Sequence, residues 1–190
     1  MINHEHKFIF THIPKCAGTS IFESLFGIGI GYSDHNTLKE DLNKRTSKYF
    51  KFTFTRKPWS RFVSTYFYFK KYGRDGEGDV NMGNVVNRYN DFKHFALNFN
   101  KIPATEWGYP HFKEQIHWVH ELHDFVGKCE NLQEDFNIVC DKIGIPRQEL
   151  PHKNKTKHKH YTEYYDDETR EIVAELYAKD IEYLGYEFGE

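Results

Sequence analysis

Hydrophobic and polar positions near the start of the chain follow the order strand, loop, helix. Residues 7–13 form a short apolar run, rich in aromatic and β-branched side chains, that ends at Pro14. Residues 20–26 carry apolar side chains at helical spacing behind a Gly-Thr-Ser start. The pattern predicts a strand over 7–13 and a helix over 20–26, joined by a short loop.

The same order recurs twice along the chain. Residues 49–55 alternate aromatic and polar side chains, and a helical pattern over 59–72 follows, with a proline suitably placed in its first turn. A third apolar run over 124–129 precedes a helical stretch over 130–143. Because strands that alternate with helices build parallel sheets, we expect an α/β fold: a central, mainly parallel sheet flanked by helices.

The remaining segments are less regular. Residues 73–84 are rich in Gly, Asn and Asp, which predicts a mobile surface loop near an acceptor, and a short helix is expected over 91–98. Residues 151–160 are dense in Lys, His and Asn and predict a basic loop. Apolar positions over 166–184 have helical spacing and predict one final amphipathic helix.

Composition narrows the class of protein. The 190 residues, 38% hydrophobic and 28% charged, suit one soluble domain over residues 1–190 with a substantial core. The formal net charge of -2 provides no global positive field, so nucleic acid is not an expected partner. Any anion site must therefore be local.

Cysteine usage and hydropathy bear on the compartment. Cys16, Cys129 and Cys140 form neither an even set nor a CxxC pair, and the first residues lack the pattern of a signal peptide. No apolar run approaches the roughly 20 residues that a membrane helix needs. We therefore expect a cytoplasmic protein without an integral membrane segment; the oligomeric state is not encoded in these patterns.

The loop between the first strand and helix has the chemistry of an anion site. It places backbone N–H groups, a helix N-terminus, the Lys15 ammonium and the Thr19 and Ser20 hydroxyls around one point, which suits phosphate or sulfate. The G-x-x-x-x-G-K-[ST] spacing of nucleoside triphosphatases is absent, because the lysine precedes Gly18. The alternative is a solvated turn in which Thr19 and Ser20 only cap the helix.

The segment Ile13-Pro-Lys-Cys-Ala-Gly-Thr-Ser20 resembles the 5′-phosphosulfate loop of sulfotransferases that use 3′-phosphoadenosine 5′-phosphosulfate (PAPS), particularly the carbohydrate branch. The resemblance implies a P-loop-like sulfotransferase fold and places Lys15 on the bridging oxygen of PAPS. It implies a cofactor site made by Lys15, Cys16, Ala17, Gly18, Thr19 and Ser20.

A second motif follows the second predicted strand. Residues 56–66 match R-x-P-x-x-R-x-x-S-x-Y, the 3′-phosphate motif of the same family. The resemblance implies that Arg56 and Ser64 bind the 3′-phosphate, whereas Arg61 either joins them or holds the loop through backbone carbonyls. Arg61 and Ser64 are three residues apart and share a helix face. The alternative is a helix with exposed arginines and an aromatic core stripe.

The resemblance continues toward the C-terminus. Residues 125–135 resemble another family segment, residues 177–186 resemble its closing helix, and residues 150–157 resemble its late loop over the nucleotide. Lys155 in that loop is a candidate to supplement the 3′-phosphate site. A histidine pair nearby lacks further Cys or His ligands at metal-site spacing, so no metal is expected.

Sulfuryl transfer needs a base at the acceptor oxygen and positive charge at the leaving bridge. Lys15 meets the second need. For the first, His35 is preferred because related sequences carry a histidine in this connection; the alternative is a neighbour of a helix cap. His111, in a segment that resembles H-x-x-x-Q, is the second candidate.

Together these features predict a sulfotransferase of the EC 2.8.2 type. It would transfer a sulfuryl group from PAPS to an acceptor hydroxyl, of a glycan or another hydroxyl compound, and release adenosine 3′,5′-bisphosphate. Two alternatives stay open: a P-loop-like nucleotide kinase, and a non-catalytic module that binds anionic ligands. The acceptor itself is not identified by any of these motifs.

Overall fold

The structure, a computed structural model, describes residues 1–27, 35–72, 77–107, 110–151 and 159–189. Its contacts divide the chain into two compact units. The first consists of Met1–Arg56 and Gln115–Lys155, and the second of Lys57–Glu114 and Thr156–Glu190. That residues 1–190 act as a single sulfotransferase domain stays a prediction.

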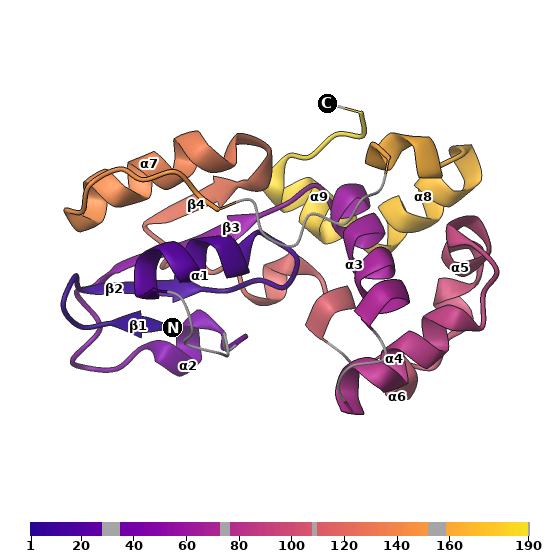
Figure 1. Cartoon of the computed structure of the whole chain (residues 1–190), viewed down its shortest axis with the longest axis horizontal. Coiled ribbons are helices and arrows are strands. Elements are labelled where there is room, and N and C mark those ends of the chain that lie inside the picture. Colours follow the sequence, from indigo (N-terminus) through magenta and orange to yellow (C-terminus); the bar gives the residue numbers. More distant parts are fainter. Residues whose placement is uncertain (28–34, 73–76, 108–109, 152–158, 190) are drawn as a thin grey trace. The chain divides into compact units, whose positions relative to one another are not determined.

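The first unit contains a four-stranded sheet with the order β1 (Ile2–Asn3), β2 (Phe8–Thr11), β3 (Phe50–Thr55) and β4 (Phe125–Lys128), as Figure 1 shows. β2 pairs with β3, and β3 with β4, in parallel, whereas β1 adds an antiparallel edge. The predicted fold class, an α/β fold with a mainly parallel sheet flanked by helices, is confirmed. The edge strand β1 was not predicted, since two residues carry no periodic pattern.

One face of this sheet carries the apolar core of the first unit. Phe52 and Phe54 of β3 alternate with polar residues and point to the same face as Phe8 and Phe10 of β2. The helices α1 (Gly18–Phe26) and α7 (Leu132–Ile143) pack their apolar sides against these rings. Because β2, β3 and β4 are parallel, the loops that follow them all leave from the same edge of the sheet.

Short elements complete the first unit. The helix α2 (Leu38–Asp41) begins after Thr37, whose backbone N–H and hydroxyl both donate to the Glu40 carboxylate, at 2.6 and 2.7 Å. These hydrogen bonds lower the pKa of Glu40. Two 3₁₀ turns, Gln115–His117 and Cys129–Asn131, flank β4.

The second unit is helical in the residues that the structure describes. Aromatic rings dominate its core: Phe62 lies 5.2 to 5.6 Å from Phe95, Phe99 and Phe112 between ring centroids. None of the described helices in the chain is both long and apolar enough to cross a membrane. The elements of this unit are α3 (Pro58–Tyr72), α4 (Glu77–Asn87), α5 (Phe92–Asn98), α6 (Ala104–Trp107), α8 (Asp167–Leu176), α9 (Ala178–Leu184) and 3₁₀ turns at Phe99–Lys101, Pro110–Phe112 and Tyr161–Tyr164.

The expectation of a mobile loop over 73–84 was wrong where the structure can test it. Residues 77–84 belong to α4, while 73–76 lie outside the described residues. Met82, Val85 and Val86 have helical spacing and are buried in the core of the second unit. Burial of this stripe outweighs the low helix propensity of the glycines and asparagines before it.

The single helix expected over 166–184 was also wrong, because the chain forms α8 and α9 with a break at Tyr177. Tyr177 leaves the helical region, at φ -116° and ψ 28°, and its buried hydroxyl donates to the Phe112 carbonyl at 3.0 Å. The N-terminus of α8 was well signalled, since Asp166 accepts from the Thr169 N–H at 2.9 Å. An aromatic side chain anchored to a distant carbonyl explains the break that periodicity does not show.

Candidate functional site

The loop between β2 and α1 has an unusual backbone. Lys15 and Ala17 have φ values of 67° and 58°, in the left-handed region that residues with a Cβ rarely adopt. Each such conformation costs about 1 kcal/mol, so the fold must hold it in place. Left-handed residues in such turns aim neighbouring N–H groups into one concavity, which is an arrangement that binds anions.

The N-terminus of α1 continues this concavity. Its N-cap residue is Ala17, no side chain caps it, and its first turn carries no acidic residue. Thr19 and Ser20 therefore do not act as N-caps, which was the alternative left open by the sequence. The first N–H groups of the helix and its positive end are positioned to meet a phosphate or sulfate.

Gly18 is required by close packing inside the loop. A Cβ atom at this position would lie 1.8 Å from Nε2 of His12, and the His12 ring is itself buried, with 6% exposure. Any larger residue would displace either the imidazole or the first turn of α1. The glycine of the motif is thus explained by contact with a side chain at the end of β2.

Arg56 lies beside this loop in the same unit. It follows the last residue of β3, and its Nη1 donates to the Lys15 carbonyl at 3.4 Å. The parallel pairing of β2 and β3 brings both residues to one edge of the sheet. Of the residues predicted to bind the nucleotide, the structure therefore places Arg56 next to Lys15 and the start of α1.

His35 contacts His12, the first residue of the same loop. Its Nδ1 lies 3.1 Å from the His12 carbonyl, its own carbonyl accepts from Trp118 Nε1 at 2.9 Å, and the His12 and His35 rings are 4.5 Å apart. The N-cap of α2 is Thr37, so His35 is not itself the capping residue. The roles of His12 and Trp118 in holding His35 were not predicted, because both contacts use backbone carbonyls.

The other predicted residues belong to the second unit or lie outside the described residues. The ring of His111 stacks on Tyr68, at 5.4 Å and 11°. Arg61 is 1% exposed and its Nη1 donates to the Lys113 backbone carbonyl at 2.8 Å, and its part in binding the 3′-phosphate stays a prediction. Ser64 of α3 is buried. Lys155 lies outside the described residues.

The three cysteines are not paired in disulfides. Cys16 is buried in the loop between β2 and α1, and its hydrogen bond to Cys129, together with burial, raises the pKa of the Cys129 thiol. The Cys129 thiol is thus held protonated, as a structural residue rather than a nucleophile. Within the described ranges, no group of three His, Cys, Asp or Glu side chains is arranged to hold a metal ion.

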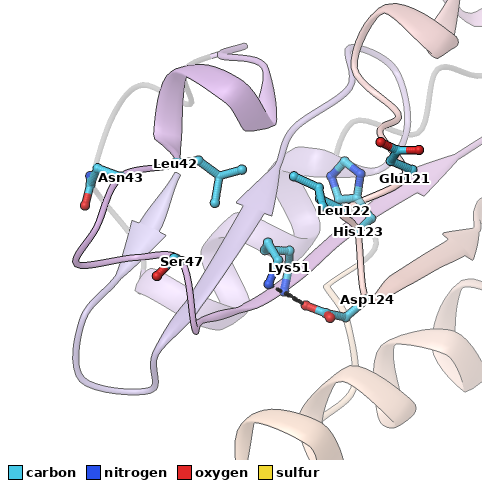
Figure 2. Close-up of a pocket in the computed structure, with 8 residues that line it drawn as sticks. All are labelled: Leu42, Asn43, Ser47, Lys51, Glu121, Leu122, His123 and Asp124. Carbon is cyan, nitrogen blue, oxygen red and sulfur yellow. Dashed lines mark hydrogen bonds and ion pairs between the residues drawn. The ribbon is translucent and has the colours of Figure 1, made fainter.

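A pocket of about 570 Å³ lies elsewhere on the first unit (Figure 2). Lys51 donates to the Asp124 carboxylate at 3.0 Å in its wall. Lys51 is near the amino end of β3 and Asp124 precedes β4, so the pocket lies toward the sheet edge opposite the anion loop. None of the predicted site residues lines it; the lining residues are Leu42, Asn43, Ser47, Lys51, Glu121, Leu122, His123 and Asp124.

His123 in this pocket makes stability depend on pH. Burial lowers its pKa to about 4, while the same group in the unfolded chain titrates near 6.5. The folded state therefore binds fewer protons between these values, and stability is lost as pH falls through that window. We expect about 1–2 kcal/mol less unfolding free energy at pH 5 than at pH 7.5 from this group, measured by urea denaturation.

The variant His123→Gln isolates this contribution, because glutamine does not titrate. Its loss of stability between pH 7.5 and pH 5 is expected to be smaller than that of the wild type by the same amount. Equal losses in the two proteins would contradict the assignment to His123.

These observations define a class of protein: an α/β protein with a left-handed loop between a strand and an uncapped helix, and an arginine after the next parallel strand. The family model described as "Sulfotransferase family" matches residues 1–187. The chain belongs to this sulfotransferase family.

Individual relatives agree at low identity. The chain is 23% identical to carbohydrate sulfotransferase 14 of Danio rerio, over 98% of this chain and 61% of that protein. It is 26% identical to carbohydrate sulfotransferase 9 of Homo sapiens, over 95% of this chain and 47% of the relative. An uncharacterized protein of Archaeoglobus fulgidus is 30% identical over 53% of this chain and 72% of its own length.

The match thus spans about half to two thirds of these two carbohydrate sulfotransferases. No solved structure matches the chain.

Proposed function

We propose that this chain transfers a sulfuryl group from PAPS to a hydroxyl of a carbohydrate acceptor and releases adenosine 3′,5′-bisphosphate. The observation that carries the proposal is the loop from Lys15 to Ser20, with two left-handed residues and an uncapped helix N-terminus in a chain of the sulfotransferase family. The proposed compartment is the cytoplasm, and no metal is part of the proposed mechanism.

The donor would lie with its phosphosulfate against the start of α1. Backbone N–H groups of Gly18 and Thr19 and the Thr19 and Ser20 hydroxyls would hold the 5′-phosphate, and Lys15 would face the bridging oxygen. Arg56, whose guanidinium reaches the Lys15 carbonyl, would hold the 3′-phosphate. Ser64 is assigned to the 3′-phosphate by the sequence motif alone.

His35 is the proposed general base. A carbonyl oxygen only accepts, so the contact with His12 requires the proton on Nδ1, and Nε2 is the nitrogen proposed to act as the base. The acceptor hydroxyl would give its proton to Nε2 while its oxygen forms the new bond to sulfur. The bond between sulfur and the bridging oxygen breaks, and the Lys15 ammonium meets the charge that develops on the leaving phosphate.

A carbohydrate acceptor is favoured because two of the relatives described above are named carbohydrate sulfotransferases. The family and the loop support the donor half of the proposal, whereas the acceptor half depends on these relatives. A screen of glycan acceptors with ³⁵S-labelled PAPS addresses it directly.

Nucleotide binding tests the part of the proposal that concerns the donor. Adenosine 3′,5′-bisphosphate should bind about 10- to 100-fold more tightly than AMP, since charge-assisted hydrogen bonds to the 3′-phosphate are added. Isothermal titration calorimetry measures both constants. Equal and weak binding of the two nucleotides would contradict the proposal. Mg²⁺-dependent ATP turnover would favour the kinase alternative. Tight binding of anionic glycans without transfer from PAPS would favour the binding module.

A further inference from the structure

Gln115 is a completely buried polar residue in the first unit. It begins the 3₁₀ turn Gln115–His117, ahead of β4, and its exposed fraction is 0%. Burial of an amide is unfavourable unless its donors and acceptor are hydrogen-bonded. The partners of this amide therefore reveal what it holds in place.

Those partners belong to the two segments that form the proposed nucleotide site. Oε1 of Gln115 accepts from the backbone N–H of Arg56 at 2.8 Å and from the thiol of Cys16 at 3.3 Å. Nε2 donates to the backbone carbonyl of Arg56 at 2.8 Å. One amide thus fixes both backbone polar groups of Arg56 and, at the same time, the residue after Lys15.

The side chain of Arg56 also contacts the loop between β2 and α1. Arg56 Nη1 donates to the Lys15 carbonyl, so the loop after β2 and the residue after β3 are joined twice, through Gln115 and through the guanidinium. The contacts of Gln115 use only the backbone of Arg56 and the Cys16 thiol, and not the guanidinium that is proposed to hold the 3′-phosphate. Their effect is to fix the spacing between the loop and the arginine before a ligand arrives.

We propose that Gln115 is a positioning residue that sets the distance between the 5′-phosphate loop and Arg56, and thereby the preference for a nucleotide that carries a 3′-phosphate. The inference rests on the proposed function. The preference is measured by the discrimination ratio, which is the dissociation constant for AMP divided by the dissociation constant for adenosine 3′,5′-bisphosphate. Loss of the amide frees Arg56 to move relative to the loop. This weakens binding of adenosine 3′,5′-bisphosphate more than binding of AMP.

The test replaces Gln115 with methionine, which has similar length and volume and makes none of the three hydrogen bonds. The discrimination ratio of Gln115→Met is expected to fall by about tenfold, measured by calorimetry with the two nucleotides. In an Arg56→Ala background, the same substitution should change the ratio less than about twofold, because the two residues act through one contact.

Thr46 provides a matched control in the same unit. It is also completely buried, and its hydroxyl donates to the Asp41 carbonyl at 3.0 Å and accepts from the Asn43 N–H at 2.9 Å, so it holds a backbone segment that belongs to none of the nucleotide motifs. Thr46→Val should lower the melting temperature and leave the discrimination ratio unchanged. A fall in the ratio equal to that of Gln115→Met would assign the effect to general loosening and overturn the inference.

A milder variant decides the matter if Gln115→Met does not fold. Gln115→Asn keeps the amide but is one methylene shorter, so it cannot make all three contacts, and its ratio should also fall. A folded Gln115 variant with the wild-type ratio overturns the inference. Failure of the proposed function has a different signature, because the wild-type protein would then show no preference for the bisphosphate over AMP.

Discussion

Lys15→Ala is expected to lower the rate of sulfuryl transfer by about 10²–10³-fold, the loss typical of removing one group that stabilises charge in a transition state. The left-handed backbone of Lys15 places the residue inside the loop, beside the uncapped start of α1. Its ammonium is proposed to meet the charge that develops on the leaving phosphate. The effect should therefore be larger on kcat than on nucleotide binding, in single-turnover assays with ³⁵S-labelled PAPS.

Two comparisons separate this effect from a general loss of positive charge. Lys39→Ala removes an exposed lysine of α2 in the same unit and should leave the rate unchanged. Lys15→Arg keeps the charge but changes the geometry of the donor group, so it should restore only part of the rate. If Lys15→Ala transferred sulfate at a rate close to that of the wild type, the assignment of Lys15 to the leaving bridge would be wrong.

The three parallel strands of the sheet were predictable because their signal is local. Alternation of Phe50, Phe52 and Phe54 with polar residues marks β3, because alternate side chains of a strand face the apolar core. By contrast, α4 was missed because its apolar stripe lies within a segment rich in Gly and Asn. The break at Tyr177 was missed for another reason: it depends on a hydrogen bond to Phe112, 65 residues earlier in the chain.

The candidate site shows the same division. The loop over residues 15–20 could be singled out because its residues are consecutive, and the structure adds its left-handed backbone and the packing of Gly18 on His12. Anion binding by this loop stays a prediction. The supports of the site were not recognised. Gln115 meets Cys16 and Arg56 only in the folded chain, across 99 and 59 residues. Contacts that join a side chain to a backbone carbonyl or N–H leave no residue-type pattern in a single sequence.

His35→Ala is expected to lower the rate of transfer by about 10²–10⁴-fold, the usual contribution of a general base, while nucleotide binding changes little. The reason is geometric. His35 touches the His12 carbonyl through Nδ1 and the Trp118 indole through its own carbonyl, so these contacts fix the residue beside the loop and Nε2 is the nitrogen proposed to take the proton. Rates come from ³⁵S-labelled PAPS at saturation, and binding of adenosine 3′,5′-bisphosphate from calorimetry on the same preparations.

The control is His111→Ala, since His111 is the second candidate and stacks on Tyr68 in the second unit. Loss of this ring should lower stability through lost packing and leave the rate per folded molecule nearly unchanged. The opposite outcome, transfer retained by His35→Ala and abolished by His111→Ala, would move the base to His111. The contacts of His35 would then serve only to order the start of the loop between β2 and α1. Because both variants are compared at saturating PAPS, a difference in rate reports on the transfer step and not on the affinity for the donor.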